Sequence, residues 1–369
     1  MAPHATDPAA LQPSFATGPE VEVVEAVGAA AWPVALLGRA RAVLPGTAAA
    51  AAIAAVATGL AHFAPVVGAP VIAILLGIAA ALVRRPSARM RPGMAFTSKR
   101  VLQGSIVLLG LGLSLGQVVS AGRHSLPVLV GTLVIALVAG WLAGKALRLP
   151  GDVATLVTVG TAICGASAIA ATDAVIDADG ADVSYAVTTI FTFNVAAVLL
   201  YPTIGHALGF SQHTFGLWAG TAINDVSSVV AAATTYGPVA ASYGVVVKLT
   251  RTLAIIPISL GLGLWRSYRQ GGTGGAPGAR RRPPLKRILP LFIPVFVAAV
   301  VCNTVGLVPP GWHRGIGDVS TWMITAALAA IGLSTNPAEL RRAGLRPLAL
   351  GGLLWVTVGL ASLGLQAIS

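Results

Sequence analysis

The sequence has little charge. Charged residues make up 10% of its 369 residues, whereas hydrophobic residues make up 56% and the mean hydropathy is +0.83. Soluble domains carry about 25% charged residues, so this composition excludes an ordinary soluble fold. Few charges between long apolar segments predict an all-α integral membrane protein.

Cysteine and histidine are also scarce. The two cysteines, Cys164 and Cys302, lie in apolar segments, and no CxxC motif surrounds either of them. The six histidines are scattered, and we expect His206 and His213 at a membrane interface. A disulfide framework and a zinc site are therefore not indicated, and we expect no metal and no cofactor.

Acidic residues number 12 against 24 basic ones, which gives a formal net charge of +12. Nucleic-acid binding would need these charges on a soluble face, but they stand between apolar runs, so we expect no nucleic-acid partner. Lys and Arg concentrate in cytoplasmic loops of membrane proteins. Placing most basic residues inside predicts a multi-pass protein of the cell inner membrane, with the N-terminus cytoplasmic and the C-terminus outside.

Apolar runs of about 17 to 25 residues can each cross the bilayer. The sequence predicts eleven such spans, at roughly 43–61, 66–83, 101–119, 126–146, 153–172, 184–208, 214–234, 239–263, 288–307, 317–335 and 347–367.

The spans divide the chain into four parts. Residues 1–42 lack the apolar core of a signal peptide and predict a disordered cytoplasmic tail. Residues 43–264 hold spans one to eight, and 288–369 hold spans nine to eleven. Residues 265–287 form a basic, Gly-rich cytoplasmic linker.

A phrase beginning Gly-Thr-Ala-Ile occurs twice, from Gly160 and from Gly220, each time inside an apolar segment. Glycine weakens a helix, and loosened backbone inside a bilayer is tolerated only against protein or a water-filled cavity. We therefore predict helix breaks at Gly160, Gly165 and Gly220, facing one binding site. Spans five and seven run parallel, so the copies either converged on one function or include a re-entrant segment.

A second echo predicts an inverted repeat. Gly112, Leu113 and Ser114 recur as Gly332, Leu333 and Ser334, and the Pro and Gly that follow recur as well. The two copies end spans three and ten, which run in opposite directions. Inverted repeats with discontinuous helices are the architecture of many secondary transporters.

Three ionisable residues lie near the middle of predicted spans: Asp225, Lys248 and Arg251. Burying one such group costs about 2.5 to 3.5 kcal/mol on insertion scales, so each is expected to be paired and functional. An ion pair that lets span eight insert is the structural alternative. Two cations facing one acid leave an excess positive charge, which predicts an oxyanion site lined by small and hydroxyl residues: Thr161, Ser167, Thr221, Asn224, Ser227, Ser228, Lys248 and Arg251.

The chemistry assigns each charge a role. Arg251 can hold a tetrahedral oxyanion or a carboxylate with two parallel donors, and Lys248 adds a point charge. Asp225 is the predicted coupling residue: it pairs with a cation in the empty state and is protonated when the anion takes its place.

At these residues the chain resembles the YeiH-type membrane proteins, which are labelled as sulfate exporters. The resemblance rests on GTAICGASAI at 160–169, AGTAINDVSSVVAAA at 219–233 and VKLTRTLAIIPI at 247–258. It implies a bacterial inner-membrane protein, similar to the bile-acid symporter and sodium/proton antiporter fold with inverted repeats. It also implies proton-coupled export of sulfate, a sulfonate or a related sulfur anion.

Other functions remain open. A sodium-coupled symporter that imports an organic anion is the main alternative. A channel would need rings of charge from oligomerisation, and an enzyme would need a nucleophile or acid pair that the chain lacks. Gly110, Gly112 and Gly116 fit packing within the chain or a homodimer face equally well.

Overall fold

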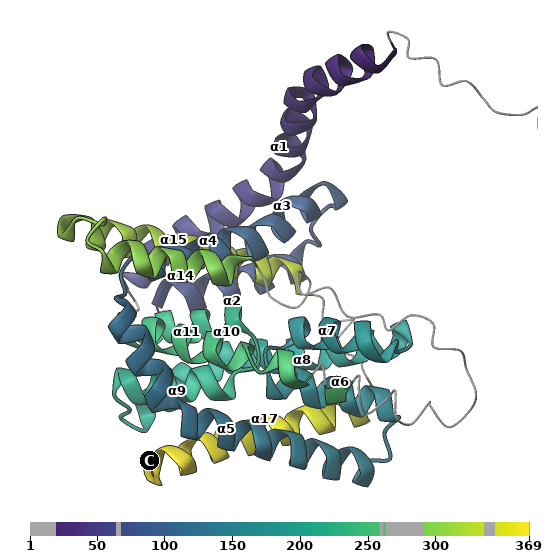
Figure 1. Ribbon diagram of the computed structural model, residues 1–369, viewed down its shortest axis with the longest axis vertical. Coiled ribbons are helices and arrows are strands. Elements are labelled where there is room, and N and C mark those ends of the chain that lie inside the picture. The colour runs from purple at the N-terminus through teal and green to yellow at the C-terminus, as the bar shows by residue number, and fades with distance from the viewer. Residues whose placement is uncertain (1–19, 64–67, 259–260, 263–290, 336–343, 369) are drawn as a thin grey trace, which may run out of the picture.

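The computed structural model describes residues 20–63, 68–258, 261–262, 291–335 and 344–368, with side chains from residue 41 onward. The described residues form helices and no strand (Figure 1). The first half holds α1 (Glu20–Ala61), α2 (Gly68–Val83), η1 (Ala88–Met90), α3 (Arg91–Phe96), η2 (Thr97–Val101), α4 (Leu102–Gly110), α5 (Leu115–Ala146), α6 (Gly151–Ala162) and α7 (Ala166–Ile176). The second half holds α8 (Gly180–Ala207), α9 (Gln212–Ala222), α10 (Val226–Tyr236), α11 (Pro238–Thr252), α14 (Phe292–Thr304), η3 (Pro310–Trp312), α15 (His313–Ser334) and α17 (Leu345–Ile368).

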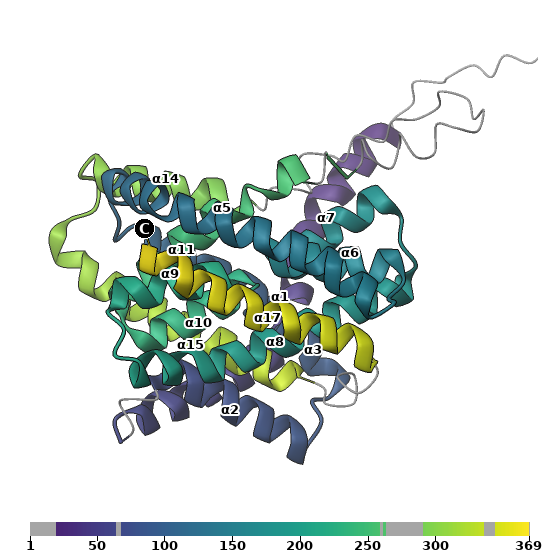
Figure 2. The same cartoon turned by 90° about the horizontal axis from the view of Figure 1, so that it is seen from below.

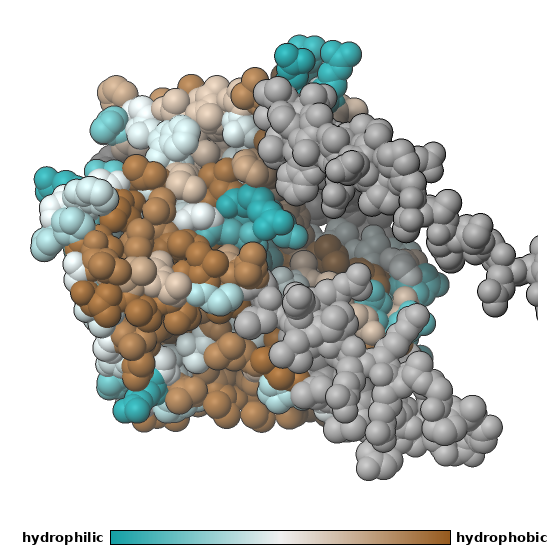
Figure 3. All heavy atoms as spheres, turned by 45° about the horizontal axis from the view of Figure 1, so that its top comes forward, coloured by the Kyte–Doolittle hydropathy of each residue, from teal (hydrophilic) through white to brown (hydrophobic). Residues whose placement is uncertain are grey.

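Six segments of the described chain are helical, long and apolar enough to cross a membrane. They are Arg41–Ala61, Leu115–Ala146, Gly180–Ala207, Pro238–Ile258, Pro310–Ser334 and Leu345–Ile368. Large apolar side chains stay exposed along them, such as Val130, Val134 and Val138 of α5. Hydrophobic residues cover much of the described surface in Figure 3. An all-α membrane protein is therefore confirmed, whereas eleven crossings are not.

The N-terminal part differs from the prediction. Helix α1 already begins at Glu20, inside the segment 1–42 that we expected to be disordered. Residues 1–19 lie outside the described residues, as does the predicted linker 265–287.

Predicted span three is interrupted. Helix α4 ends at Gly110, and α5 begins at Leu115 after a capping box in which Ser114 accepts from the backbone of Gln117 and the Gln117 side chain accepts from the backbone of Ser114. Such a box satisfies backbone donors that a helix start leaves unpaired. The end of predicted span three therefore belongs to the first turn of α5.

Helices α9 and α10 form a hairpin. The side chain of Gln212, at the start of α9, accepts hydrogen bonds from the backbone of Val239 (2.9 Å) and Ala240 (3.3 Å), just beyond the end of α10. The Tyr236 hydroxyl at the end of α10 donates to the carbonyl of Phe210. The chain therefore returns to where α9 began, and predicted span seven turns back on itself.

Helices α6 and α7 form a second hairpin. A Cβ added to Gly160 of α6 would lie 3.0 Å from the side chain of Ile169 of α7. Val153, near the start of α6, and Ile176, at the end of α7, belong to one buried cluster. In Figure 1 the two hairpins lie toward opposite edges of the molecule. Predicted span five is thus a hairpin as well.

Helices α5 and α17 pack side by side (Figure 2). Gly131 of α5 contacts Leu365, whereas Ala136 shares a buried cluster with Val358, so the two helices run antiparallel. They carry the Pro and Gly of the second sequence echo, Pro127 and Gly131 in α5 and Pro347 and Gly351 in α17, whereas Gly112–Ser114 precede α5 and Gly332–Ser334 end α15. The antiparallel packing is what an inverted repeat requires, and the repeat itself stays a prediction.

Candidate functional site

The tip of the α6–α7 hairpin depends on one glycine. Helix α6 ends at Ala162, Ile163 and Cys164 follow, and Gly165 precedes α7 with φ +70° and ψ −135°. Residues with side chains rarely adopt such a positive φ. Gly165 therefore allows the chain to turn back.

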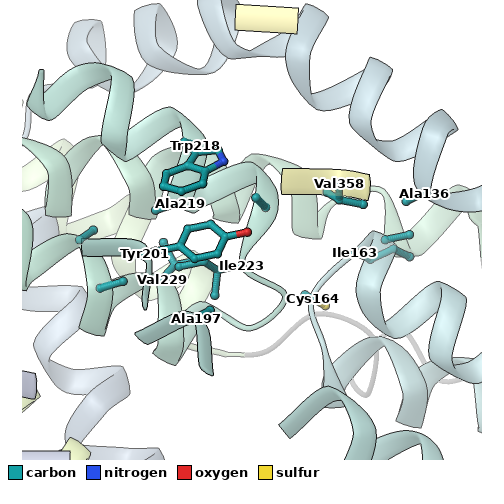
Figure 4. Packing of buried hydrophobic residues seen from close by; sticks show 14 of the residues in the cluster. Ala136, Ile163, Cys164, Ala197, Tyr201, Trp218, Ala219, Ile223, Val229 and Val358 are labelled. Atoms are coloured by element: carbon teal, nitrogen blue, oxygen red, sulfur yellow. The ribbon is translucent and has the colours of Figure 1, made fainter. Parts of the chain in front are cut away.

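The tip of the α9–α10 hairpin contacts the first tip. Helix α9 ends at Ala222 and α10 begins at Val226, with Asp225 as its extended N-cap residue. A Cβ added to Gly165 would lie only 3.2 Å from Cβ of Asp225. Figure 4 shows Ile163 and Cys164 of one tip and Ile223 of the other within one buried cluster. The ends of the two Gly-Thr-Ala-Ile phrases therefore lie next to each other, and that they face one binding site stays a prediction.

Two buried cations of α11 hold the two tips. Lys248 is 0% exposed, and its Nζ donates to the carbonyl of Ile223 at 2.7 Å. Arg251 is 3% exposed, and its Nε donates to the carbonyl of Ala162 at 2.6 Å. Both carbonyls lie at a helix C-terminus, where backbone acceptors lack partners and carry partial negative charge. Each cation therefore donates a hydrogen bond to a carbonyl at one hairpin tip that is otherwise unpaired within the described residues.

Most of the Arg251 guanidinium is still free to bind. Its Nη1 and Nη2 are buried and make no hydrogen bond to any described residue, and the same holds for Oδ1 of Asn224. A buried polar group without a partner is costly, so such groups point to a missing ligand or water. The two Nη atoms form the forked donor pair that oxyanions and carboxylates accept.

Asp225 caps α10 instead of pairing with a cation. Its carboxylate accepts from the backbone N–H of Ser227 at 3.1 Å and from the Ser227 hydroxyl. Lys248 is close enough to interact with it electrostatically, but within the described residues no ion pair joins Asp225 to Lys248 or Arg251. The ion pair that we expected is replaced by a helix cap, because the N-terminus of α10 offers unpaired donors.

The other predicted hydroxyl residues divide into two groups. The hydroxyls of Thr161 and Thr221 donate to carbonyls four residues earlier in their own helices. The Thr221 hydroxyl also shares a 2.6 Å hydrogen bond with the hydroxyl of Ser362 of α17. Ser228 is buried beside Asp225, whereas Ser167 is exposed at the start of α7. The threonines thus stabilise the hairpins, and the serines lie at the tips.

Gly160 and Gly220 do not lie at the breaks. Each stands inside its helix, two residues before the end. A Cβ on Gly220 would come 2.8 Å from Val247, so this glycine lets α9 pack closely on α11. Of the three predicted glycines, only Gly165 has the conformation of a break.

Asp225 also lines a small space between helices. A cavity of about 30 Å³ lies between α2, α8, α10 and α15, and its polar wall consists of Asn194, Asp225, Ser227 and Ser228. Sequence reasoning missed Asn194 and Ser362, because each lies on a helix far along the chain and no repeated motif marks them.

A wider cleft of about 810 Å³ opens where the α9–α10 hairpin begins. It is lined by α5, α9 and α11 and by the turn before α5, with His124 and His213 among its polar residues. Val246 of α11 lies in its wall, two residues before Lys248. The cleft therefore extends along α11 to about the level of Lys248.

Comparison with known proteins identifies the family. A family model described as "Conserved hypothetical protein 698" matches residues 45–351. A "UPF0324 membrane protein" of Streptococcus mutans is 42% identical over 309 residues, which cover 82% of this chain and 90% of that protein. The chain belongs to the UPF0324 family.

Two other UPF0324 proteins match the chain over a similar length. A relative from Fusobacterium nucleatum is 40% identical over 84% of this chain and 93% of its own length, and one from Streptococcus pneumoniae is 40% identical over 84% and 92%. The resemblance to YeiH-type proteins is thereby confirmed. No solved structure matches the chain, so its likeness to the bile-acid symporter fold stays a prediction.

Proposed function

We propose that the protein is a secondary active transporter of a small anion, namely sulfate or a related sulfur oxyanion or sulfonate, exported with proton coupling. The observation that carries this proposal is Arg251, whose two Nη atoms are buried without a described partner beside the hairpin tips. A fork of donors in a water-poor site suits a tetrahedral oxyanion or sulfonate.

The charges at the tips set what the site accepts. Each tip joins a helix C-terminus to a helix N-terminus, so the partial charges of about half a unit offset each other there. The two positive charges of Lys248 and Arg251 and the one negative charge of Asp225 then sum to a net charge of about +1. A dianion balances the site when Asp225 is protonated, which gives a physical reason for carrying a proton with sulfate.

Two re-entrant hairpins provide a route for alternating access. Each hairpin arm has 11 or 12 residues, which is about 17 Å of helix and roughly half the hydrocarbon thickness. With two spans replaced by hairpins, the chain crosses about nine times, and the basic loops stay on one side. The hairpins then enter from opposite faces, an arrangement typical of inverted repeats.

A sodium-coupled symporter that imports an organic anion is the second candidate. The oxygen-lined cavity beside Asp225 favours it, since sodium prefers such sites near unwound helix segments. Flux into inverted vesicles, measured with and without a sodium gradient, separates the two candidates. A proton-linked exporter accumulates the anion without sodium.

Binding to purified protein tests the anion site directly. Radiolabelled sulfate is bound at equilibrium, and unlabelled sulfite, taurine and carboxylates compete with it, for the wild type, Arg251→Ala and the control Arg314→Ala, whose side chain is exposed. We expect Arg251→Ala to lose binding of every competitor that the wild type recognises and Arg314→Ala to keep it. Affinity retained in Arg251→Ala would assign Arg251 to holding the Ala162 carbonyl alone.

A further inference from the structure

We propose that the cavity beside Asp225 is a binding site for one sodium ion. The proposal rests on the proposed function in one respect, because it takes Asp225 as the coupling residue. The same carboxylate carries the proton of the proposed cycle, so a proton and sodium are alternative occupants.

The wall of the cavity provides oxygen ligands. Its polar residues are Asn194 of α8, Asp225 at the hairpin tip, and Ser227 and Ser228 of α10. No Lys, Arg or His belongs to the described residues that line it. Carboxylate, amide and hydroxyl oxygens are ligands for hard cations, so the lining selects a cation over an anion.

Asn194 gives an independent sign of a missing ligand. Its side chain is only 6% exposed, and its Oδ1 accepts no hydrogen bond from any described residue. If Asp225 were protonated, its single O–H could donate to only one acceptor at a time. A cation in the cavity would contact the amide oxygen, the carboxylate and the serine hydroxyls together.

Size and charge favour a monovalent ion. The volume of about 30 Å³ has room for only one or two water-sized occupants. Magnesium keeps several of its waters and would not fit with them. Asp225 is the one charged residue among the described residues of the wall, and Lys248 already interacts with it electrostatically. Apart from Asn194, Ser227 and Ser228, the wall is apolar and includes Ile74, Leu328 and Ile331. A divalent ion would leave an unbalanced charge against that wall.

Thermal unfolding of the purified full-length protein tests the site. Melting temperature is measured while sodium chloride replaces choline chloride at constant ionic strength, and potassium chloride serves as the comparison. Because a ligand of the native state stabilises it by mass action, we expect a saturable rise with sodium and a much smaller one with potassium. Equal shifts with potassium or choline would overturn the proposal.

Variants locate the effect. Asn194→Leu and the milder Ser228→Ala should lose most of the sodium-dependent shift. Thr189→Val is the matched control, because Thr189 is also on α8 and also has a buried hydroxyl without a described partner, but it does not line the cavity. A sodium shift that persists in Ser228→Ala and in Asn194→Leu would show that sodium binds elsewhere or not specifically.

Anion binding in sodium-free choline buffer distinguishes this proposal from the proposed function. Sulfate binding that depends on Arg251 but is accompanied by no sodium shift would refute only the sodium site. A sodium shift in a protein that binds no anion would support the sodium site and contradict the oxyanion transporter.

Discussion

Nε of Arg251 donates a 2.6 Å hydrogen bond to the carbonyl of Ala162, although 89 residues separate them. One helical turn earlier, Lys248 makes the equivalent bond to Ile223 of the other tip. A single face of α11 therefore joins both hairpins. Any change in the distance between the tips must move these two side chains or break their bonds.

Replacing Lys248 should affect binding more than stability. Lys248→Met removes a buried charge, whose desolvation offsets much of what its hydrogen bond contributes. We expect the unfolding free energy to change by less than about 1 kcal/mol, while sulfate affinity falls at least about tenfold, equivalent to 1.4 kcal/mol. Chemical denaturation and equilibrium binding give the two values.

The control for this variant is Lys145→Met, because Lys145 is exposed and stacks on Trp141 at 3.7 Å. It should leave affinity unchanged. If Lys248→Met instead lowers the unfolding free energy by clearly more than about 1 kcal/mol and leaves affinity intact, Lys248 acts only by capping α9.

Adding one methyl group to Gly165 should destabilise the tip. Gly165→Ala forces a side chain into φ +70° and brings Cβ within 3.2 Å of Asp225 and 3.4 Å of Ile190. We expect a loss of about 1 to 3 kcal/mol in unfolding free energy. Gly180→Ala is the control, since nothing lies within 4 Å of its added Cβ, and it should cost nothing measurable.

The sequence predicted the charged centre but not its partners. Asp225, Lys248 and Arg251 stand out because ionisable residues are rare inside apolar segments. Asp225 lies at one tip, and the two cations of α11 each bond to a tip carbonyl. The acceptors of both cations are backbone carbonyls, which carry no sequence signal. From the sequence we expected Asp225 to form an ion pair, whereas in the structure its carboxylate caps the N-terminus of α10.

The hairpins were hidden for a different reason. A run of about 20 apolar residues has the same composition whether it crosses the bilayer or turns back halfway. Whether the chain turns back depends instead on the positive φ of Gly165 and on the hydrogen bond from Val239 to Gln212, which are 27 residues apart. Composition reveals neither of them. Two turned-back segments change the side only of the loops that lie between them, and every basic loop keeps its side, so the charge pattern could not reveal them.

Cysteine labelling from the two sides of the membrane tests the hairpins. In a Cys164→Ala, Cys302→Ala background, single cysteines replace Leu208, Val239 and Ala181, all of them exposed. We expect an impermeant thiol reagent to reach positions 208 and 239 from the same side and position 181 from the other. Eleven crossings would instead place 208 opposite 239 and put 181 with 239.

Gln212 should behave as a helix cap supplied by another helix. Its Oε1 accepts from the backbone N–H of Val239 and Ala240 in the first turn of α11, where donors lack partners within the helix. Gln212→Leu removes the acceptor and should cost about 0.5 to 2 kcal/mol of unfolding free energy. Gln212→Glu keeps the acceptor and adds a negative charge at a helix N-terminus, so it should retain or raise stability by about 0.3 to 1 kcal/mol.

Denaturation of both Gln212 variants beside Ser242→Ala measures these differences. The Ser242 hydroxyl only bonds back to Pro238 of its own helix, so its loss should change stability by less than about 0.5 kcal/mol. Because Gln212 joins the start of α9 to the start of α11, the leucine variant should also loosen the base of the hairpin. Faster protease cleavage between α8 and α9 in Gln212→Leu, absent in Gln212→Glu, would establish that link, and equal cleavage in both would contradict it.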